Sequence, residues 1–239
     1  MDRYAISAIP TSKSEIKQCQ ASSQGILPTH PFRAYIVGAS GSGKSNLLIS
    51  LLSRTDMYKD YFDKIFILSP TANKLDDSYK ILNLDDDSYF DPQNGTELLK
   101  VIESIQKKNI NKIGIGKAPK VLIVMDDIIS YKKFMRSKIL LKFFIMSRHY
   151  GISIILLSQA YHRVPKSIRL NVSALMFFRG SQKENEVVYM DYCCPGFNKK
   201  SFLKLINEAT KERYNFLYID LNRSITSGRY RKNLTEKLI

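Results

Sequence analysis

The sequence predicts an α/β fold in which helices flank a mainly parallel sheet. Short apolar runs alternate with helical stretches along most of the 239 residues. A glycine-rich loop separates the first apolar run from the first helix, and a later run ends in two carboxylates. Strands that alternate with helices indicate a parallel sheet built from right-handed crossovers.

The predicted strands are runs rich in Ile, Val, Leu or Phe, at residues 34–37, 64–68, 121–125, 152–157 and 174–178. Runs that stay apolar, without alternation, are typical of strands buried on both faces of a parallel sheet. The spacing of apolar side chains predicts the intervening helices, over residues 44–54, 96–107, 138–150 and 182–191. A helix over 199–210 and a strand over 214–220 are expected to follow.

The loop after the first strand matches the pattern G-x-x-x-x-G-K-[ST] in full. Its residues, with the next one along, are Gly38, Ala39, Ser40, Gly41, Ser42, Gly43, Lys44, Ser45 and Asn46. Glycines let backbone N–H groups turn inward toward phosphate oxygens, and the helix adds the positive end of its dipole. We expect Lys44 to reach the β- and γ-phosphates and the Ser45 hydroxyl to ligate Mg²⁺. The motif therefore predicts a P-loop NTPase that binds a nucleoside triphosphate with Mg²⁺, and the motifs below make ATP the expected nucleotide.

The strand over 121–125 ends in Asp126 and Asp127, which is the Walker B pattern. Asp126 falls at the carboxyl end of the strand, where open α/β sheets bind ligands, and we expect it to hold Mg²⁺. Asp127 takes the position of a base that polarises the water attacking the γ-phosphate. The alternative is that both acids only end the strand as turn formers.

Sheet order decides the class of P-loop fold. If the strand over 64–68 lies between the phosphate-loop strand and the strand before Asp126, the fold is of the additional-strand ATPase type, with a RecA-like core.

The strand over 152–157 ends in Ser158 and Gln159. An amide at that tip can touch both the γ-phosphate and the attacking water, so Gln159 is a candidate sensor; a simple strand cap is the alternative.

The charge of the chain is strongly positive and unevenly spread. Lys and Arg total 37 against 22 Asp and Glu, a formal net charge of +15. Residues 128–183 contain no Asp or Glu, and basic residues recur throughout them. A basic surface that tracks a phosphate backbone is the favoured interpretation, with solvated helix faces as the alternative.

Two arginines are candidates for acting on a neighbouring subunit. Ring ATPases insert an arginine into the next subunit's site, where it stabilises charge in the transition state. Arg148 is the first candidate and Arg179 the second. An ion pair or a DNA contact is the alternative for each.

Three regions are expected along the chain: an irregular lead-in over residues 1–28, a P-loop ATPase domain over 29–222 and a basic tail over 223–239. The lead-in lacks the apolar region of a signal peptide. No apolar run approaches the roughly 20 residues that span a bilayer. The positive charge alone fits nucleic acid or an acidic membrane, and the ATPase motifs favour DNA, so no membrane partner is expected. The three cysteines, two of them adjacent, suggest neither a disulfide framework nor a zinc site, which favours an intracellular setting.

These residues together resemble the viral genome-packaging ATPases of the FtsK–HerA superfamily, found in poxviruses, other large DNA viruses and virophages. The resemblance covers about residues 32–220. It rests on the phosphate loop, the strand with the double Asp, the segment SRHYGIS at 147–153 leading to Gln159, and FLYID at 216–220. It implies a ring of identical subunits that uses ATP to thread double-stranded DNA into a preformed capsid. Capsid proteins are then further partners. The expected location is the host cytoplasm or a viral factory, and the resemblance is also compatible with retention of the protein in the virion.

Two rival hypotheses remain. A helicase-type ATPase would act on single strands and stack bases on Tyr or Phe, and strand displacement would reveal it. A non-enzymatic module would use nucleotide only as a switch and bind ATP without turnover. The intact acid pair argues against the second rival.

Overall fold

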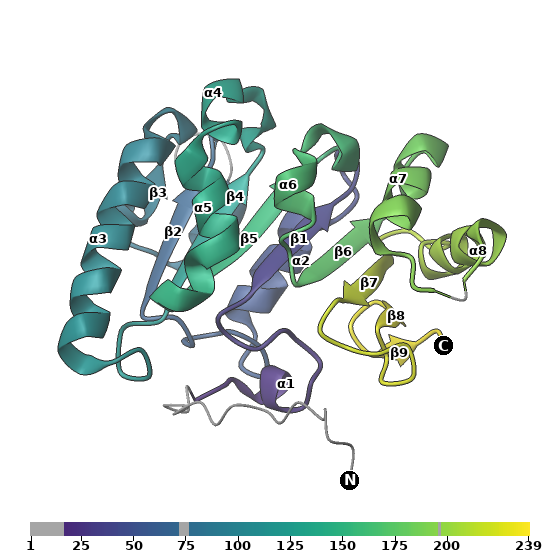
Figure 1. Cartoon of the computed structure of the whole chain (residues 1–239), viewed down its shortest axis with the longest axis horizontal. Helices are drawn as coiled ribbons and strands as arrows, with labels where there is room; N and C mark the ends of the chain where they lie inside the picture. Colours follow the sequence, from purple (N-terminus) through teal and green to yellow (C-terminus); the bar gives the residue numbers. More distant parts are fainter. Residues whose placement is uncertain (1–16, 72–76, 196) are drawn as a thin grey trace, which may run out of the picture.

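The computed structural model describes residues 17–71, 77–195 and 197–239, and its centre is one sheet with helices on both faces (Figure 1). Within these residues the strand order is β3 (Tyr89–Phe90), β2 (Lys64–Leu68), β4 (Val121–Asp126), β5 (Ile152–Ser158), β1 (Arg33–Val37), β6 (Ala174–Phe178), β7 (Phe216–Asp220), β8 (Tyr230–Lys232) and β9 (Glu236–Lys237). Neighbouring strands from β3 through β6 are parallel, and β7, β8 and β9 extend the sheet antiparallel. The predicted α/β fold with a mainly parallel sheet is confirmed.

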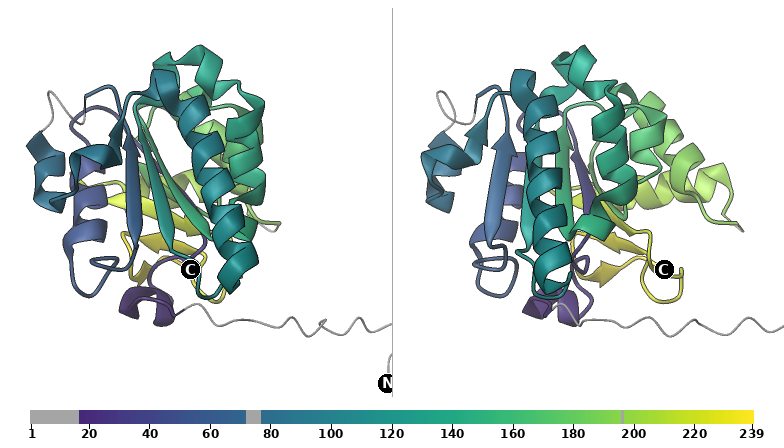
Figure 2. Two further views of the ribbon diagram at one scale, coloured as in Figure 1. Left: turned by 90° about the vertical axis from the view of Figure 1, so that its left-hand side faces the viewer. Right: turned by 60° about the vertical axis from the view of Figure 1, so that its left-hand side comes forward.

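The sheet separates two apolar cores. Figure 2 shows the helices that cover the two faces of the sheet. One core lies under α2 (Lys44–Ser53), and the other lies under α3 (Gly95–Ile113), α5 (Lys138–Met146), α7 (Gln182–Tyr192) and α8 (Lys199–Ala209). Strand β4 contributes side chains to both cores: Ile123 packs in the core with α3 and α5, and Leu122 packs in the core with α2. Burial on both faces explains why the strand is apolar at every position.

The described residues also contain three short α-helices, α1 (Gln20–Ser23), α4 (Lys132–Met135) and α6 (Lys166–Arg169). None of the helices in residues 17–71, 77–195 and 197–239 is long and apolar enough to cross a membrane.

Three predicted elements differ in their bounds by two residues or more at one end. The helix expected over 138–150 ends at Met146 and continues as a 3₁₀ turn, because Gly151 with φ 60° redirects the chain into β5. The helix expected over 96–107 runs on to Ile113 and stops before Gly114, whose φ is 79°. The strand expected from residue 214 starts only at Phe216, because Tyr214 takes a φ of 69° that interrupts the extended backbone.

The condition stated for the inserted strand is not met by residues 64–68, and another strand meets it. Strand β2, residues 64–68, lies outside β4, and the strand between β4 and β1 is β5. The reason is that the crossover through α4 and α5 returns the chain to the β1 side of β4, where Asp126 pairs with Leu157. One strand still separates the phosphate-loop strand from the acidic strand, so the additional-strand type stands.

The sheet continues through the expected C-terminal boundary. Strand β8 pairs with β7, and β9 pairs with β8, so residues beyond 222 belong to the same sheet. Part of the expected lead-in forms α1, and residues 1–16 lie outside the described residues. The division into one domain with appendages stays a prediction.

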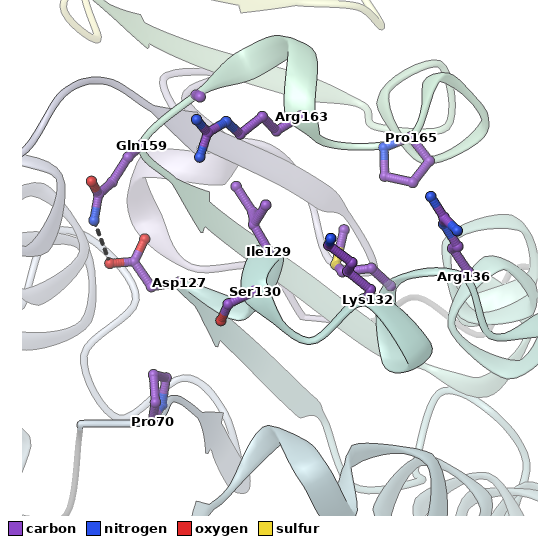
Figure 3. Close-up of a pocket in the computed structure, with 11 residues that line it drawn as sticks. Pro70, Asp127, Ile129, Ser130, Lys132, Arg136, Gln159, Arg163 and Pro165 are labelled. Atoms are coloured by element: carbon purple, nitrogen blue, oxygen red, sulfur yellow. Dashed lines mark hydrogen bonds between the residues drawn. The ribbon is translucent and has the colours of Figure 1, made fainter.

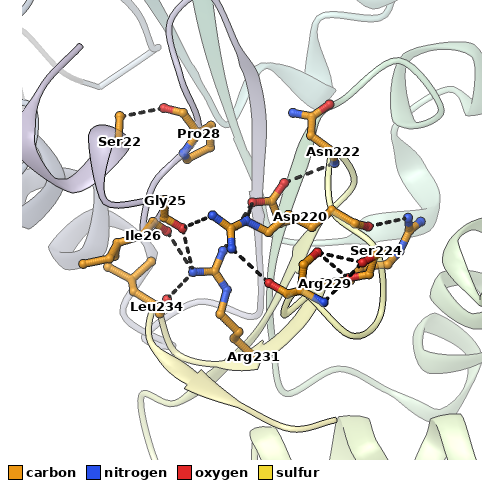
Figure 4. A network of polar contacts seen from close by, with 12 residues as sticks. Ser22, Gly25, Ile26, Pro28, Asp220, Asn222, Ser224, Arg229, Arg231 and Leu234 are labelled. Atoms are coloured by element: carbon orange, nitrogen blue, oxygen red, sulfur yellow. Dashed lines mark hydrogen bonds and ion pairs between the residues drawn. The ribbon is translucent and has the colours of Figure 1, made fainter.

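Arginines of the expected basic tail bind within the molecule (Figure 4). Arg231, whose side chain is 5% exposed, lies with Nη2 at 3.3 Å from Asp220 Oδ2 and donates from Nη1 to the carbonyl oxygens of Gly25, Ile26 and Leu234. Arg223 contacts the same carboxylate oxygen at 3.1 Å and also donates to Gly25. These contacts tie residues 25–26 to β7 and β8, so this part of the positive charge has an internal role.

Candidate active site

The predicted site residues follow three strands whose carboxyl ends meet at one edge of the sheet. Gly38 follows β1, Asp126 ends β4 with Asp127 directly after it, and Gln159 follows β5. These strands are parallel and adjacent in the order β4, β5, β1, with Val37 opposite Ser158. The topology therefore brings together the phosphate loop, the acidic pair and the amide, which lie far apart in the sequence.

The backbone conformation and close packing of the phosphate loop require glycine at several of its positions. Gly41 and Gly43 have φ of 73° and 104°, in the left-handed region that L side chains avoid. A Cβ at Gly38 would lie 2.5 Å from the Cβ of Phe178 on β6. The N–H of Gly38 donates to the carbonyl of Ser158 at 3.2 Å, which fixes the loop to β5.

Lys44 begins α2 and its side chain folds back over the loop. It is 8% exposed, and Nζ donates to the carbonyl oxygens of Gly38 and Ala39 at 2.8 and 3.1 Å. Burial lowers the pKa of the Lys44 ammonium, and the Asp127 and Asp126 carboxylates oppose that shift only in part. The charge is thus held where an anion in the loop would stabilise it.

Asp126 is buried and its carboxylate is oriented by a residue that the sequence did not point to. The hydroxyl of Tyr79 donates to Asp126 Oδ2 at 2.6 Å. Tyr79 is itself fully buried, in the 3₁₀ helix Asp77–Leu82 between β2 and β3. A single tyrosine in a polar stretch carries no recognisable pattern, so only the fold reveals this contact.

The oxygen donors at the site fit Mg²⁺. Ser45 is half-buried in the first turn of α2 and Asp126 ends β4, so a hydroxyl and a carboxylate flank the phosphate loop. No group of three or more His, Cys, Asp or Glu side chains within the described residues forms a metal cage. Magnesium is usually held by one or two carboxylates and takes its remaining ligands from phosphates and water, so the two donors suit this ion.

Asp127 and Gln159 are in direct contact. Gln159 Nε2 donates to Asp127 Oδ2 at 2.8 Å. Asp127 has a φ of 49°, an uncommon conformation for a residue with a side chain, and such backbone strain concentrates at functional sites. Gln159 is exposed at the tip of β5, so its amide is open to a ligand in the loop.

A cavity of about 710 Å³ opens beside this pair (Figure 3). Asp127 and Gln159 form one side of it, Arg163 extends toward Gln159, and Lys132 and Arg136 lie on the far side. All three cations are exposed and belong to the acid-free stretch 128–183. The structure thus joins the acidic pair to part of the basic surface.

The rest of that basic stretch divides into exposed and internally paired residues. Arg169 is buried and pairs with Asp191 at 2.9 Å, and Lys142 pairs with Glu103 at 2.6 Å. The exposed ones are Lys132, Lys133, Arg136, Lys138, Arg148, Arg163, Lys166, Arg179 and Lys183. Most of the expected basic surface is therefore accessible.

The two candidate arginines lie at different edges of the sheet. Arg148 is exposed in the 3₁₀ turn before β5, whereas the site lies after β5, so the structure does not bring Arg148 to the phosphate loop of its own chain. Arg179 follows β6, and it shares a cavity with residues 39–42 of the loop. A role for either arginine on a neighbouring subunit stays a prediction.

Comparison with known proteins identifies the family of the chain. The profile of the family described as "Poxvirus A32 protein" matches residues 21–233. The DNA packaging protein OPG160 of Vaccinia virus (strain Copenhagen) is 31% identical over 196 residues, a match covering 77% of this chain and 66% of that protein. The corresponding protein of Monkeypox virus is 30% identical over 190 residues, covering 77% and 60%. The chain thus spans somewhat less than two thirds of the length of these relatives.

Solved structures confirm the fold. The genome packaging NTPase B204 from Sulfolobus turreted icosahedral virus 2, in complex with AMPPCP, has a TM-score of 0.58 at 15% identity, covering 84% of this chain and 96% of B204. EssC (ATPases 2 and 3) from Geobacillus thermodenitrificans has a TM-score of 0.56 at 13% identity, covering 86% and 39%. The predicted P-loop fold is therefore confirmed.

Proposed function

The chain belongs to the poxvirus A32 protein family, and on that premise we propose that it is an ATP-driven motor that moves double-stranded DNA and packages a viral genome into a preformed capsid. Its relatives in Vaccinia and Monkeypox virus are named DNA packaging proteins. The observation that carries the proposal is the hydrogen bond between Gln159 and Asp127 at the edge that also carries Lys44 and Asp126. A site that only held nucleotide would not need this pair.

The phosphate loop binds the triphosphate of ATP in this proposal. Backbone N–H groups of residues 38–46 face the phosphate oxygens, and Lys44 exchanges its two carbonyl acceptors for the β- and γ-phosphates. Ser45 and Asp126 hold Mg²⁺, with Tyr79 keeping the Asp126 carboxylate in position. When bound, Mg²⁺ neutralises charge on the β- and γ-phosphates.

Hydrolysis uses the contacting pair. The carboxylate of Asp127 accepts a proton from the attacking water, and the amide of Gln159 detects the γ-phosphate. In the structure the amide nitrogen is bound to Asp127. A γ-phosphate competes for that N–H, so nucleotide binding releases the carboxylate to act on water. Sensing and activation are thereby coupled through one hydrogen bond.

Double-stranded DNA is the proposed second anion. The exposed cations of residues 128–183 contact its phosphates, and Lys132, Arg136 and Arg163 line the same cavity as the catalytic pair. The proposed assembly is a ring of identical subunits that docks on capsid proteins in the host cytoplasm or viral factory, without membrane contact. A movement of Asp127 and Gln159 on ATP hydrolysis is then transmitted over a short distance to the cations that contact DNA.

Stimulation of ATP hydrolysis by DNA tests this function. We expect double-stranded DNA to raise the wild-type rate, and the effect to weaken as salt rises, because phosphate contacts release counterions. Stimulation by single-stranded DNA alone, accompanied by strand displacement, would instead select the helicase alternative.

Mixing two inactive variants tests the ring. Arg148→Ala lacks the trans-acting arginine and Lys44→Ala lacks a working loop, so each alone is expected to lose ATP hydrolysis, the first by about 10³-fold or more. A mixture restores activity at interfaces where an intact loop meets an intact arginine. Full activity of Arg148→Ala alone would remove Arg148 from this role and leave Arg179 as the next candidate.

A further inference from the structure

A second cavity lies beside the phosphate loop, on the side away from the acidic pair. Its volume is about 450 Å³, and it is lined by residues 39–42, by Phe178 and Arg179, and by residues 210–215 between α8 and β7. Strands β6 and β7 lie on one side of β1, and β5 and β4 lie on the other. The phosphate loop therefore lies between this cavity and Asp127.

We propose that this cavity holds the base and ribose of the bound nucleotide, with the ring of Tyr214 as the surface on which the base stacks. The inference rests on the proposed function, in which residues 38–46 bind a nucleoside triphosphate. The terminal phosphate of that ligand lies beside Asp126 and Asp127. The other end of the ligand leaves the loop in the opposite direction, toward β6 and β7, where the cavity is.

Tyr214 lies against the loop and keeps much of its ring accessible. A Cβ on Gly43 would be 3.2 Å from Tyr214 Cδ1, so the ring borders the last glycine of the loop, while the residue as a whole is 53% exposed. The guanidinium carbon of Arg213 is 4.7 Å from the ring centroid, a cation–π contact. An aromatic base has the flat shape and the π-face that this surface accepts.

The backbone holds Tyr214 in an unusual conformation. Its φ of 69° is one that a bulky residue rarely adopts, so its surroundings must maintain it. Asn215 provides such support, because its Nδ2 donates to Glu212 Oε2 at 2.8 Å and its Oδ1 accepts from Asn233 Nδ2 at 3.0 Å. Asn233 in turn accepts at Oδ1 from the N–H of Phe216 at 3.2 Å, which links the loop to β7 and β8.

The same contacts indicate how the base is recognised. The side-chain amide of Asn215 is engaged at both its nitrogen and its oxygen, and the hydroxyl of Thr210 donates to the carbonyl of Ile206. These contacts reduce the number of polar groups of Asn215 and Thr210 that remain for the edge of a base. Stacking on Tyr214 is therefore a main source of base affinity in this proposal.

Binding of ATP and of inorganic tripolyphosphate, each with Mg²⁺, separates the base from the phosphates. We expect wild type to bind ATP more tightly than tripolyphosphate. Tyr214→Ala should weaken ATP binding by about tenfold, the loss of one stacking contact, and leave the tripolyphosphate Kd unchanged. Tyr214→Phe keeps the ring and should retain the wild-type Kd for ATP. Isothermal titration calorimetry gives these constants without relying on turnover.

Each other outcome contradicts the inference in a distinct way. Unchanged ATP binding by Tyr214→Ala, or an equal loss for ATP and tripolyphosphate, would overturn the stacking role; the second result would assign Tyr214 to support of the loop. Wild type that binds tripolyphosphate as tightly as ATP would overturn the base site while sparing the proposed function. Wild type that binds neither ATP nor tripolyphosphate would overturn both the base site and the proposed function.

Discussion

Gln159 Nε2 donates a 2.8 Å hydrogen bond to Asp127 Oδ2 across the carboxyl ends of two adjacent strands. The strand that carries Gln159 is also adjacent to the phosphate-loop strand, so the amide lies between the loop and the acid. Asp127 holds its side chain there through a left-handed backbone conformation. This relationship links detection of the γ-phosphate to activation of water in the proposed mechanism.

Asp127→Asn should lower kcat by about 10²- to 10⁴-fold, because the amide keeps the shape of the side chain but does not accept the proton of water. ATP binding should be retained, since the loop is untouched. Steady-state kinetics and nucleotide titration measure the two effects. Asp87→Asn, at an exposed carboxylate outside the site, is the matched control and should keep the wild-type kcat. Wild-type turnover by Asp127→Asn would remove this residue as the base.

Tyr79→Phe removes the hydroxyl that orients the Asp126 carboxylate. Loss of an outer-shell contact of this kind typically weakens metal affinity by about 10- to 100-fold. We therefore expect a higher Mg²⁺ concentration for half-maximal ATP hydrolysis, with full rate recovered at saturating Mg²⁺. Tyr189→Phe, in α7, is the control and should leave the Mg²⁺ titration unchanged. Superimposable titrations for Tyr79→Phe and wild type would show that the contact does not serve the metal.

Asp220→Asn should destabilise the protein by about 3 kcal/mol, because it leaves a buried arginine without its anion. Its carboxylate lies within 3.3 Å of Arg231 and 3.1 Å of Arg223, and the side chain is 7% exposed. Chemical unfolding gives the free energy. Asp56→Asn breaks the exposed pair with Arg54 and should have no measurable effect. Equal results for the two variants would contradict a structural role for the tail arginines.

His30 predicts a loss of stability in mild acid. Burial lowers the pKa of His30 from 6.5 to about 4, with Lys120 lowering it further and Asp63 opposing, and its Nδ1 lies 2.7 Å from Ser153 Oγ. The unfolded chain binds a proton at higher pH than the folded one. The contribution of neutral His30 to the free energy of unfolding is therefore complete above pH 6.5. It falls by about 3 kcal/mol in total as the pH falls toward 4.

Comparison of wild type with His30→Gln isolates this contribution from that of other titrating groups. The difference in unfolding free energy between the two proteins should shrink by that amount between pH 7.5 and pH 4. Urea unfolding at a series of pH values measures it. A difference that stays constant over the range would mean that His30 titrates alike in both states.

Local patterns were sufficient to predict the longer strands and helices and the residues of the candidate site, but not the short strands β3, β8 and β9. The glycines, Lys44 and the acids occur at fixed spacings, and each adjoins a strand that is apolar throughout because both its faces are buried. Gln159 could be proposed because a polar residue after a buried strand must lie at the edge of the sheet. These inferences needed only neighbouring residues in the sequence.

Features that depend on the path of the chain between elements were not predictable in the same way. The order of the strands depends on which side of β4 each crossover returns, so the sequence left open whether 64–68 is the inserted strand, and the structure shows that β5 is. Tyr79 reaches Asp126 across 47 residues, and the tail arginines reach Gly25 across about 200. No local signal distinguishes an arginine that will be buried beside Asp220 from one that will face DNA.

The most direct test of the central claim is ATP hydrolysis by wild type and by Lys44→Ala, each with and without double-stranded DNA. Lys44→Ala removes the buried ammonium that contacts Gly38 and Ala39, and Lys112→Ala, at an exposed lysine near the end of α3, is the matched control. We predict hydrolysis by wild type and Lys112→Ala that rises with DNA, and none by a folded Lys44→Ala protein. Unchanged turnover by folded Lys44→Ala would contradict the assignment of this site as the ATPase centre.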